Sequence, residues 1–177
     1  RVESLVNQGL KSKNIQNQVK KAVRKMFDYS ALSEEALSFT WKSADARQRK
    51  NFQTAFRNLI ESNYIAKAKS YVGDRHQIRF ASETIQKNTA KVSCFVAQKE
   101  VDIQILYILR KVELSWKVVD IILDEASLVS SYRSQFSQYL AGGQHSLDQL
   151  TQKIESMSKK IESEKAEDYE WLADTLL

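Results

Sequence analysis

Residues 116–136 read WKVVDIILDEASLVSSYRSQF and predict a strand that passes through an acidic turn into an amphipathic helix. Apolar residues fill most of 116–123, as in a short buried strand. Ser127 then matches a typical N-cap, because its hydroxyl can accept a hydrogen bond from a free backbone N–H. We expect the helix to end at Gly142-Gly143. Three- and four-residue spacing gives it one apolar side, formed by Val129, Tyr132 and Phe136.

Two registers are open for the strand of this junction. Side chains alternate between the faces of a strand, so a shift of one residue exchanges the inward set. One register turns inward Val119, Ile121 and Leu123. The other turns inward Trp116, Val118 and Ile122.

Three further strands are predicted upstream, where the apolar period changes from helical to alternating. They span 77–84, 90–97 and 101–109, and short polar links join them as in an antiparallel meander. One face of the middle strand carries Val92, Cys94 and Val96. The second half of the last strand is apolar on both faces, which predicts cover on both sides or a lined cavity.

The remaining segments have helical periodicity. Residues 2–29 carry apolar side chains at helical spacing, and Ser33 with the two glutamates after it predicts the start of a short helix. The segment 43–46 predicts the start of a longer helix, whose apolar face is formed by Phe52, Phe56, Leu59, Ile60 and Tyr64. Residues 145–177 predict a charged helical tail. We find no linker or repeat, and therefore expect a single α+β domain over 1–177.

The composition excludes several classes of protein. The net charge of +5 comes from 27 basic and 22 acidic residues that are interleaved, without the clustered patch that nucleic-acid binding needs. No stretch reaches the roughly 18 apolar residues of a membrane span. The single cysteine, Cys94, excludes an intramolecular disulfide and a thiolate zinc cluster. The chain begins at Arg1, as expected of a trimmed piece or of a mature chain whose signal peptide is gone.

Catalytic machinery is not evident in the sequence. His76 and His145 stand in no metal-ligand spacing, no glycine-rich phosphate loop is present, and Cys94 is interpreted as a small core residue. Three aspartates are candidates either for a general base in an apolar pocket or for helix caps and turns: Asp28, Asp120 and Asp124. Two alternative functions follow, an isomerase-like enzyme of the cone-shaped α+β type with Asp28 or Asp120 as base, and a protein-interaction module.

Three blocks of sequence over roughly 20–140 resemble the MlaC family, the carriers of phospholipid in the bacterial periplasm. The first block is Phe27-Asp28-Tyr29 with Leu37 and Trp41. The second is Arg49, Phe52, Phe56-Arg57, Leu59-Ile60 and Tyr64. The third and most specific is Tyr107, Leu109, Trp116-Lys117-Val118, Asp120-Ile121, Ser127-Leu128-Val129, Tyr132-Arg133 and Phe136. The chain departs from the family pattern at Ser38 and Glu125, which replace usual glycines, and in lacking a proline before the central helix.

The resemblance implies a curved four-stranded antiparallel sheet with about six or seven helices packed on it around an apolar cavity. It implies a non-enzymatic periplasmic carrier that holds the acyl chains of a phospholipid, with no metal and no cofactor other than this cargo. It also implies two docking partners, an outer-membrane lipoprotein complex and an inner-membrane MCE-domain ring linked to an ABC transporter. We expect a monomer that docks transiently and binds no nucleotide.

Thirteen residues are the candidate lining of that cavity. The helices contribute Phe27, Phe39, Phe52, Phe56, Ile60 and Tyr64. The sheet contributes Val92, Val96, Ile105 and Tyr107, and the late helix contributes Val129, Tyr132 and Phe136. Arg133 has two open roles, a structural pair with Asp124 or Asp28 and a contact with the lipid phosphate.

Overall fold

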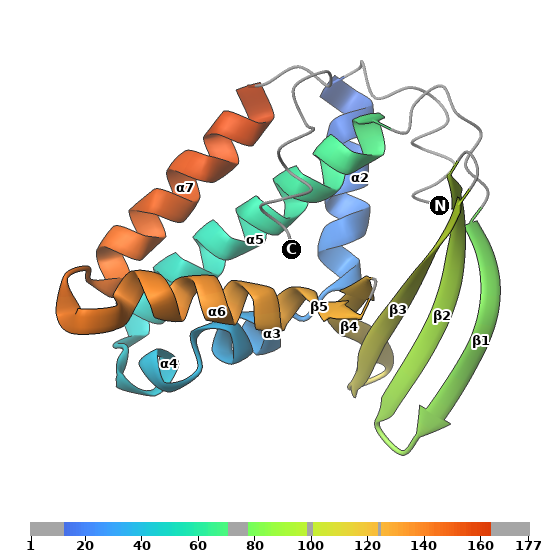
Figure 1. Ribbon diagram of the computed structural model, residues 1–177, viewed down its shortest axis with the longest axis horizontal. Helices are drawn as coiled ribbons and strands as arrows, with labels where there is room; N and C mark the ends of the chain where they lie inside the picture. Colours follow the sequence, from blue (N-terminus) through green and yellow to red (C-terminus); the bar gives the residue numbers. More distant parts are fainter. Residues whose placement is uncertain (1–12, 71–77, 99–100, 124, 164–177) are drawn as a thin grey trace.

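The computed structural model describes residues 13–70, 78–98, 101–123 and 125–163, which form an α+β fold (Figure 1). Within these ranges, four helices precede the strands and two helices follow them. The helices are α2 (Lys13–Met26), α3 (Tyr29–Leu37), α4 (Phe39–Ser43), α5 (Ala46–Ser70), α6 (Leu128–Leu140) and α7 (Leu147–Ser163), with a 3-10 turn η1 (Ala141–Gly143) after α6. The strands are β1 (Ile78–Gln86), β2 (Thr89–Gln98), β3 (Val101–Val112), β4 (Ser115–Leu123) and β5 (Ala126–Ser127).

The strands form one antiparallel sheet in the order β1-β2-β3-β4-β5, which confirms the predicted fold class. The four predicted strands lie within three residues of the observed bounds. The additional strand, β5, has two residues and pairs with the end of β4 through Ile122 and Ser127. A strand of this length is too short to show an alternating pattern in the sequence.

A β-bulge in β4 settles which of its residues face the helices. The pairing Ile108↔Asp120 is followed by Leu109↔Val118, so Val119 is an extra residue on β4. Two residues of β4 that flank the bulge and are three positions apart in the sequence therefore point to the same face of the sheet. Val118 and Ile121 both turn toward the helical core, and neither of the two predicted registers is correct along the whole strand.

Reciprocal hydrogen bonds start the two helices that pack along each other, α5 and α7 (Figure 1). The N–H of Gln48 donates to Asp45 Oδ1 at 2.7 Å, and the N–H of Asp45 donates to Gln48 Oε1 at 3.2 Å. Ser146 and Gln149 form the same arrangement before α7. These capping boxes fix the entry of each helix, and they place α5 where the segment 43–46 predicted.

The start of α3 differs from the prediction. The helix begins at Tyr29, because the N–H of Ala31 donates to Asp28 Oδ1 at 3.0 Å and makes Asp28 the N-cap. Ser33, the predicted cap, lies inside the helix and donates its hydroxyl to the carbonyl of Tyr29 at 2.7 Å. A serine can form either kind of bond, so its position in the sequence does not decide between them.

The core lies between the helices and the part of the sheet formed by β3 and β4. Its fully buried side chains come from α2, α3, α5 and α7, with Phe52, Phe56, Leu32, Leu59 and Ile154 among the largest. The sheet contributes Val118, and the partly buried Tyr107, Leu109 and Ile121 pack against the same cluster. One sheet face is therefore directed toward the helices.

Candidate functional site

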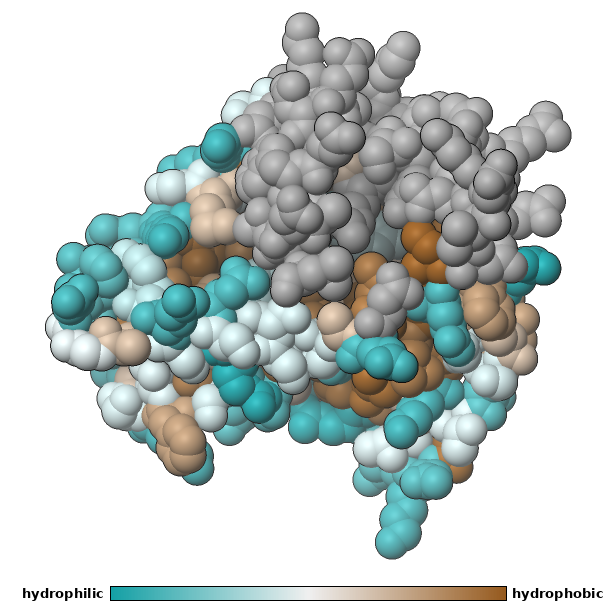
Figure 2. Space-filling view, in the orientation of Figure 1, coloured by the Kyte–Doolittle hydropathy of each residue, from teal (hydrophilic) through white to brown (hydrophobic). Residues whose placement is uncertain are grey.

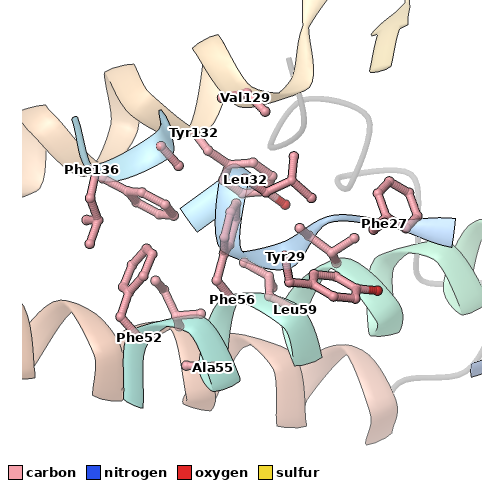
Figure 3. Close-up of a cluster of buried hydrophobic side chains, with 14 of the residues drawn as sticks. Phe27, Tyr29, Leu32, Phe52, Ala55, Phe56, Leu59, Val129, Tyr132 and Phe136 are labelled. Carbon is pink, nitrogen blue, oxygen red and sulfur yellow. The ribbon is translucent and has the colours of Figure 1, made fainter. Parts of the chain in front are cut away.

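Four aromatic rings from α5 and α6 pack against one another in the hydrophobic core (Figure 3). Phe56 lies 4.9 Å from Tyr132 and 5.5 Å from Phe136 between ring centroids, and Phe52 lies 5.6 Å from Phe136, all edge to face. Edge-to-face pairs at these distances are favourable beyond the area they bury. The rings fill the space between α5 and α6 and hold the two helices together.

Seven of the thirteen predicted lining residues are buried in this core. They are no more than 5% exposed and make their contacts within the protein: Phe27, Phe52, Phe56, Ile60, Val129, Tyr132 and Phe136. The structure therefore brings them together as the packed wall of the helical layer. Their contact with a ligand stays a prediction.

Five further predicted residues are half-buried, one on α5 and four on the sheet: Tyr64, Val92, Val96, Ile105 and Tyr107. Residues paired across an antiparallel sheet point to the same face. The pairs Val96↔Ile103, Cys94↔Ile105↔Leu123 and Val92↔Tyr107↔Ile121 therefore form one continuous apolar face on β2, β3 and β4. We call these eight residues the apolar sheet face. All eight are half-buried, and Figure 2 shows apolar residues gathered between the helices and the sheet.

The apolar sheet face is directed toward the helical core. Tyr107 and Ile121 pack against the helical core, whereas the other six members are not part of that packing among the described residues. Burial raises the pKa of Tyr107, and the neighbouring Tyr64 and Cys94 raise it further. Both tyrosines and the thiol are therefore neutral near pH 7, since burial also raises the pKa of Tyr64 and of Cys94.

Phe39 does not lie with the other predicted lining residues. Its side chain is 83% exposed at the start of α4, and Lys42 Nζ lies 5.8 Å from the centre of its ring. The helix α4 has five residues and none of them is buried. An aromatic residue in so short a helix is not directed inward by any helical periodicity, and the prediction for Phe39 found no support in its position.

Sequence reasoning missed Asn63, a polar residue within the core. Its Nδ2 donates to the hydroxyl of Tyr132 at 3.0 Å, and the bond joins α5 to α6 behind the aromatic rings. Asn63 Oδ1 is buried and has no hydrogen-bond partner among the described residues. Asparagine alone among apolar neighbours at helical spacing is the signal that was available, because a buried amide needs a partner.

Asp28, one candidate base, is engaged in holding the helices to the sheet. Its N–H donates to the carbonyl of Val118 at 3.0 Å, and its carboxylate caps α3 and pairs with Arg110 at 2.8 Å. Burial by itself raises the pKa of Asp28, but the N–H of Ala31 and the Arg110 guanidinium together hold this pKa below its usual range. A carboxylate in this state is a weak proton acceptor near pH 7.

Asp120, the other candidate base, accepts three hydrogen bonds. The donors are the hydroxyl of Ser127 at 2.6 Å and the backbone N–H groups of Ile121 at 2.8 Å and Val129 at 3.1 Å. The carboxylate therefore ties β4 to the N-terminus of α6, where a negative charge is favourable. Three of its roughly four acceptor sites are thus used in this structural role.

Arg133 pairs with Glu35, and the predicted pairing with Asp28 is wrong. Arg133 Nε donates to the carbonyl oxygen of Glu35 at 2.9 Å, and its terminal nitrogen pairs with the Glu35 carboxylate. The cause is the packing of α6 along α3, which brings Arg133 to the C-terminal half of α3 and leaves Asp28 to Arg110. Asp124, the other predicted partner, lies outside the described residues.

A polar cleft of about 300 Å³ lies beside this ion pair, between α3, α6 and β4. Arg110 and Arg133 line it together with Glu35 and Asp120, and each arginine is paired with a carboxylate. Opposite charges therefore balance in the cleft. Its charged lining differs from the apolar side chains of the apolar sheet face.

No group of three or more histidine, cysteine, aspartate or glutamate side chains within the described ranges is arranged to hold a metal ion. Across the same ranges, every helix is too short or too polar to cross a bilayer.

A family model matches this chain, and a similar fold is found among solved structures. A family model described as MlaC protein matches residues 2–156 of the 177. Among solved structures, the chain is similar to a phospholipid-binding protein from Ralstonia solanacearum in complex with a phospholipid. The two share 15% sequence identity with a TM-score of 0.73, and the match covers 92% of this chain and 93% of the other. No curated protein matches this chain.

Proposed function

The chain belongs to the MlaC family, and on this premise we propose that it is a periplasmic carrier of phospholipid. The carrier holds the acyl chains and shuttles the lipid between outer-membrane and inner-membrane complexes. One observation in the structure supports the binding step above the others. It is the apolar sheet face, eight half-buried apolar or thiol side chains on three strands that are directed toward the helices.

We place the acyl chains against this face because its side chains retain accessible surface. The aromatic rings of α5 and α6 already pack against one another. An acyl chain would have to separate Phe56 from Tyr132 to reach them. The half-buried Val92, Val96 and Ile105 require no such rearrangement. Of the thirteen predicted residues, the four on the sheet and Tyr64 are therefore our candidates for direct contact with lipid.

The strength of the hydrophobic effect requires that the lipid be enclosed. Each methylene kept from water contributes about 0.8 kcal/mol, so the roughly 30 methylenes of a two-chain lipid contribute about 24 kcal/mol. A groove that left half of them wet would be about 12 kcal/mol less favourable than the bilayer. Near-complete enclosure makes the exchange with a membrane close to neutral in free energy, and the direction of transport then depends on the partners.

Family membership is also the basis for the partners and the compartment that we propose. The partners are an outer-membrane lipoprotein complex and an inner-membrane MCE-domain ring with its ABC transporter. We propose that residues 1–177 act as one domain in this exchange and bind no nucleotide. Cross-linking of the carrier to each complex in isolated membranes tests both partners, and absence of both cross-links removes this part of the proposal.

The test of lipid binding is native mass spectrometry of the purified protein, followed by uptake of labelled phospholipid after the cargo has been stripped. We expect a complex with a phospholipid mass and saturable uptake. An empty protein that accepts no labelled phospholipid would exclude the carrier. An isomerase would instead lose turnover in Asp120→Asn, a substitution that the carrier tolerates in its lipid uptake.

A matched pair of variants tests the site within the sheet. Val96 and Phe95 are neighbouring, half-buried residues of β2 that point to opposite faces. We expect Val96→Glu to abolish lipid uptake because it places a charge on the apolar sheet face, and Phe95→Glu to retain it. Equal uptake by the two folded variants would remove β2 from the binding site.

A further inference from the structure

Two hairpin turns lie at one end of the sheet, the turn between β1 and β2 and the turn between β3 and β4. The N–H of Lys111 donates to the carbonyl of Asn88 at 2.8 Å and links the first turn to β3. We call residues 85–91 and 110–117 the hairpin end. Its β1–β2 turn lies at the lower end of the sheet in Figure 1. Most side chains of the hairpin end are exposed, in contrast to those of the buried core.

Among the described residues, three of the five exposed large apolar side chains belong to the hairpin end. Leu114, in the β3–β4 turn, is 98% exposed, Ile85 is 54% exposed and Trp116 is 36% exposed. They are distributed over the width of four strands, about 14 Å at the usual strand spacing. Single exposed apolar residues are ordinary, whereas three of them at one end of a sheet are typical of a surface that contacts a partner or a membrane.

Basic residues surround these apolar side chains. The hairpin end carries five cations and one carboxylate: Lys87, Lys91, Arg110, Lys111 and Lys117, with Glu113. Its net charge is +4, or +3 when Asp28, the partner of Arg110, is included. The helix α2 also carries five cations and no carboxylate, so the hairpin end is distinguished by positive charge combined with exposed apolar side chains.

We propose that the hairpin end docks on the surface of a bilayer that contains anionic phospholipid. Leu114 and Ile85 enter the interface, Trp116 lies at the level of the head groups, and the exposed Lys87, Lys91 and Lys111 face the phosphates. Lys117 instead donates to the carbonyl of Lys25 at 2.6 Å. Tryptophan and lysine are the residues that favour this level of a membrane. A bilayer accepts separate protruding side chains, whereas a protein partner needs a matching pocket for each of them. The inference rests on the proposed function, since a phospholipid carrier works next to membranes.

The test is cosedimentation of the full chain with vesicles of phosphatidylglycerol and phosphatidylcholine, and with phosphatidylcholine vesicles alone. We expect binding to the anionic vesicles that weakens with salt, because exposed charges are screened. Lys87→Glu combined with Lys111→Glu reverses two charges, and we expect binding to fall about tenfold or more. We expect a loss of about tenfold for Leu114→Ser, which removes the most exposed apolar side chain.

Lys21→Glu combined with Lys159→Glu is the matched control, because it reverses two charges at exposed positions on α2 and α7. We expect it to bind anionic vesicles as the parent does. The proposal is overturned if the parent does not bind anionic vesicles, or if hairpin-end and control variants bind equally. In the second case the row of apolar residues belongs to a protein contact instead.

Native mass spectrometry of the same proteins separates this inference from the proposed function. A parent that holds phospholipid but ignores vesicles overturns the docking surface and leaves the carrier intact. A parent that docks on vesicles but never holds phospholipid overturns the carrier. Thermal unfolding of each variant verifies its fold, and we expect no change because the substituted side chains are exposed.

Discussion

Asp120 accepts a hydrogen bond from the hydroxyl of Ser127 at 2.6 Å, and the same hydroxyl accepts a bond from the N–H of Ser130 at 3.0 Å. The two hydrogen bonds thus form a relay from Asp120 on β4, through the N-cap Ser127, to the first turn of α6. It determines where α6 leaves the sheet, and so where Tyr132 and Phe136 enter the core.

The relay predicts that Asp120→Asn lowers the free energy of unfolding by about 1–3 kcal/mol, because the charge at the N-terminus of α6 and its optimal acceptor geometry are lost. Urea denaturation measures the change. Glu34→Gln, an exposed carboxylate on α3, is the control for the loss of one charge. Equal stability of Asp120→Asn and the parent would contradict the structural role of Asp120.

Arg133 is predicted to be structural. Because the ion pair with Glu35 is largely exposed, Arg133→Gln should reduce the free energy of unfolding by less than about 1 kcal/mol. Phospholipid uptake should not change. Arg47→Gln, which breaks a similar surface pair with Asp148, is the matched control for uptake. A strong loss of uptake in Arg133→Gln alone would instead assign the arginine to the lipid phosphate.

Asp28 gives the stability a dependence on pH with a defined sign. Its pKa is lower in the folded protein than in the unfolded chain, so its contribution is complete above the unfolded value of about 3.9 and is lost as the pH falls through the folded value. The stability difference between the parent and Asp28→Asn should be constant from about pH 7 to pH 5 and shrink below about pH 4. Denaturation at several pH values measures it. A difference that grows on acidification would contradict the assignment.

Ser38 occupies a backbone conformation that favours glycine, with φ 50° and ψ −118°. Ser38→Gly should therefore raise the free energy of unfolding by about 1 kcal/mol, because the strain of a non-glycine residue is relieved. Ser134→Gly, in the exposed interior of α6, should lower it by about 0.5–1 kcal/mol. Thermal or urea denaturation compares the two. A loss of stability in both variants would show that the Ser38 backbone is not strained.

The sequence predicted features that depend on local patterns. The strand bounds followed from alternation, and the start of α6 at Ser127 and its end before Gly142 followed from capping chemistry. Positive φ angles at Ser38 and Glu125 coincide with the two positions where the family usually has glycine. Both residues therefore adopt a backbone conformation that favours glycine.

Features that depend on packing between distant elements could not be read from the sequence. The bulge at Val119 mixes the two predicted faces of β4, and a single extra residue leaves no mark on an apolar run. The partner of Arg133 depends on how α6 lies along α3. Likewise, periodicity identified Phe56 and Phe136 as inward-facing but did not show that they would pack against each other.

The central claim is that phospholipid lies against the apolar sheet face, and Cys94 is a natural probe of it. This cysteine is the only one in the chain, is half-buried, and pairs across the sheet with Ile105. The measurement is the rate at which N-ethylmaleimide alkylates Cys94 in lipid-loaded and in stripped protein, with a Ser43→Cys, Cys94→Ser double variant as the exposed control. We predict a rate several-fold slower in the loaded protein for Cys94 and no difference for the control. Equal Cys94 rates, in protein that mass spectrometry shows to hold one phospholipid per chain, would contradict the account.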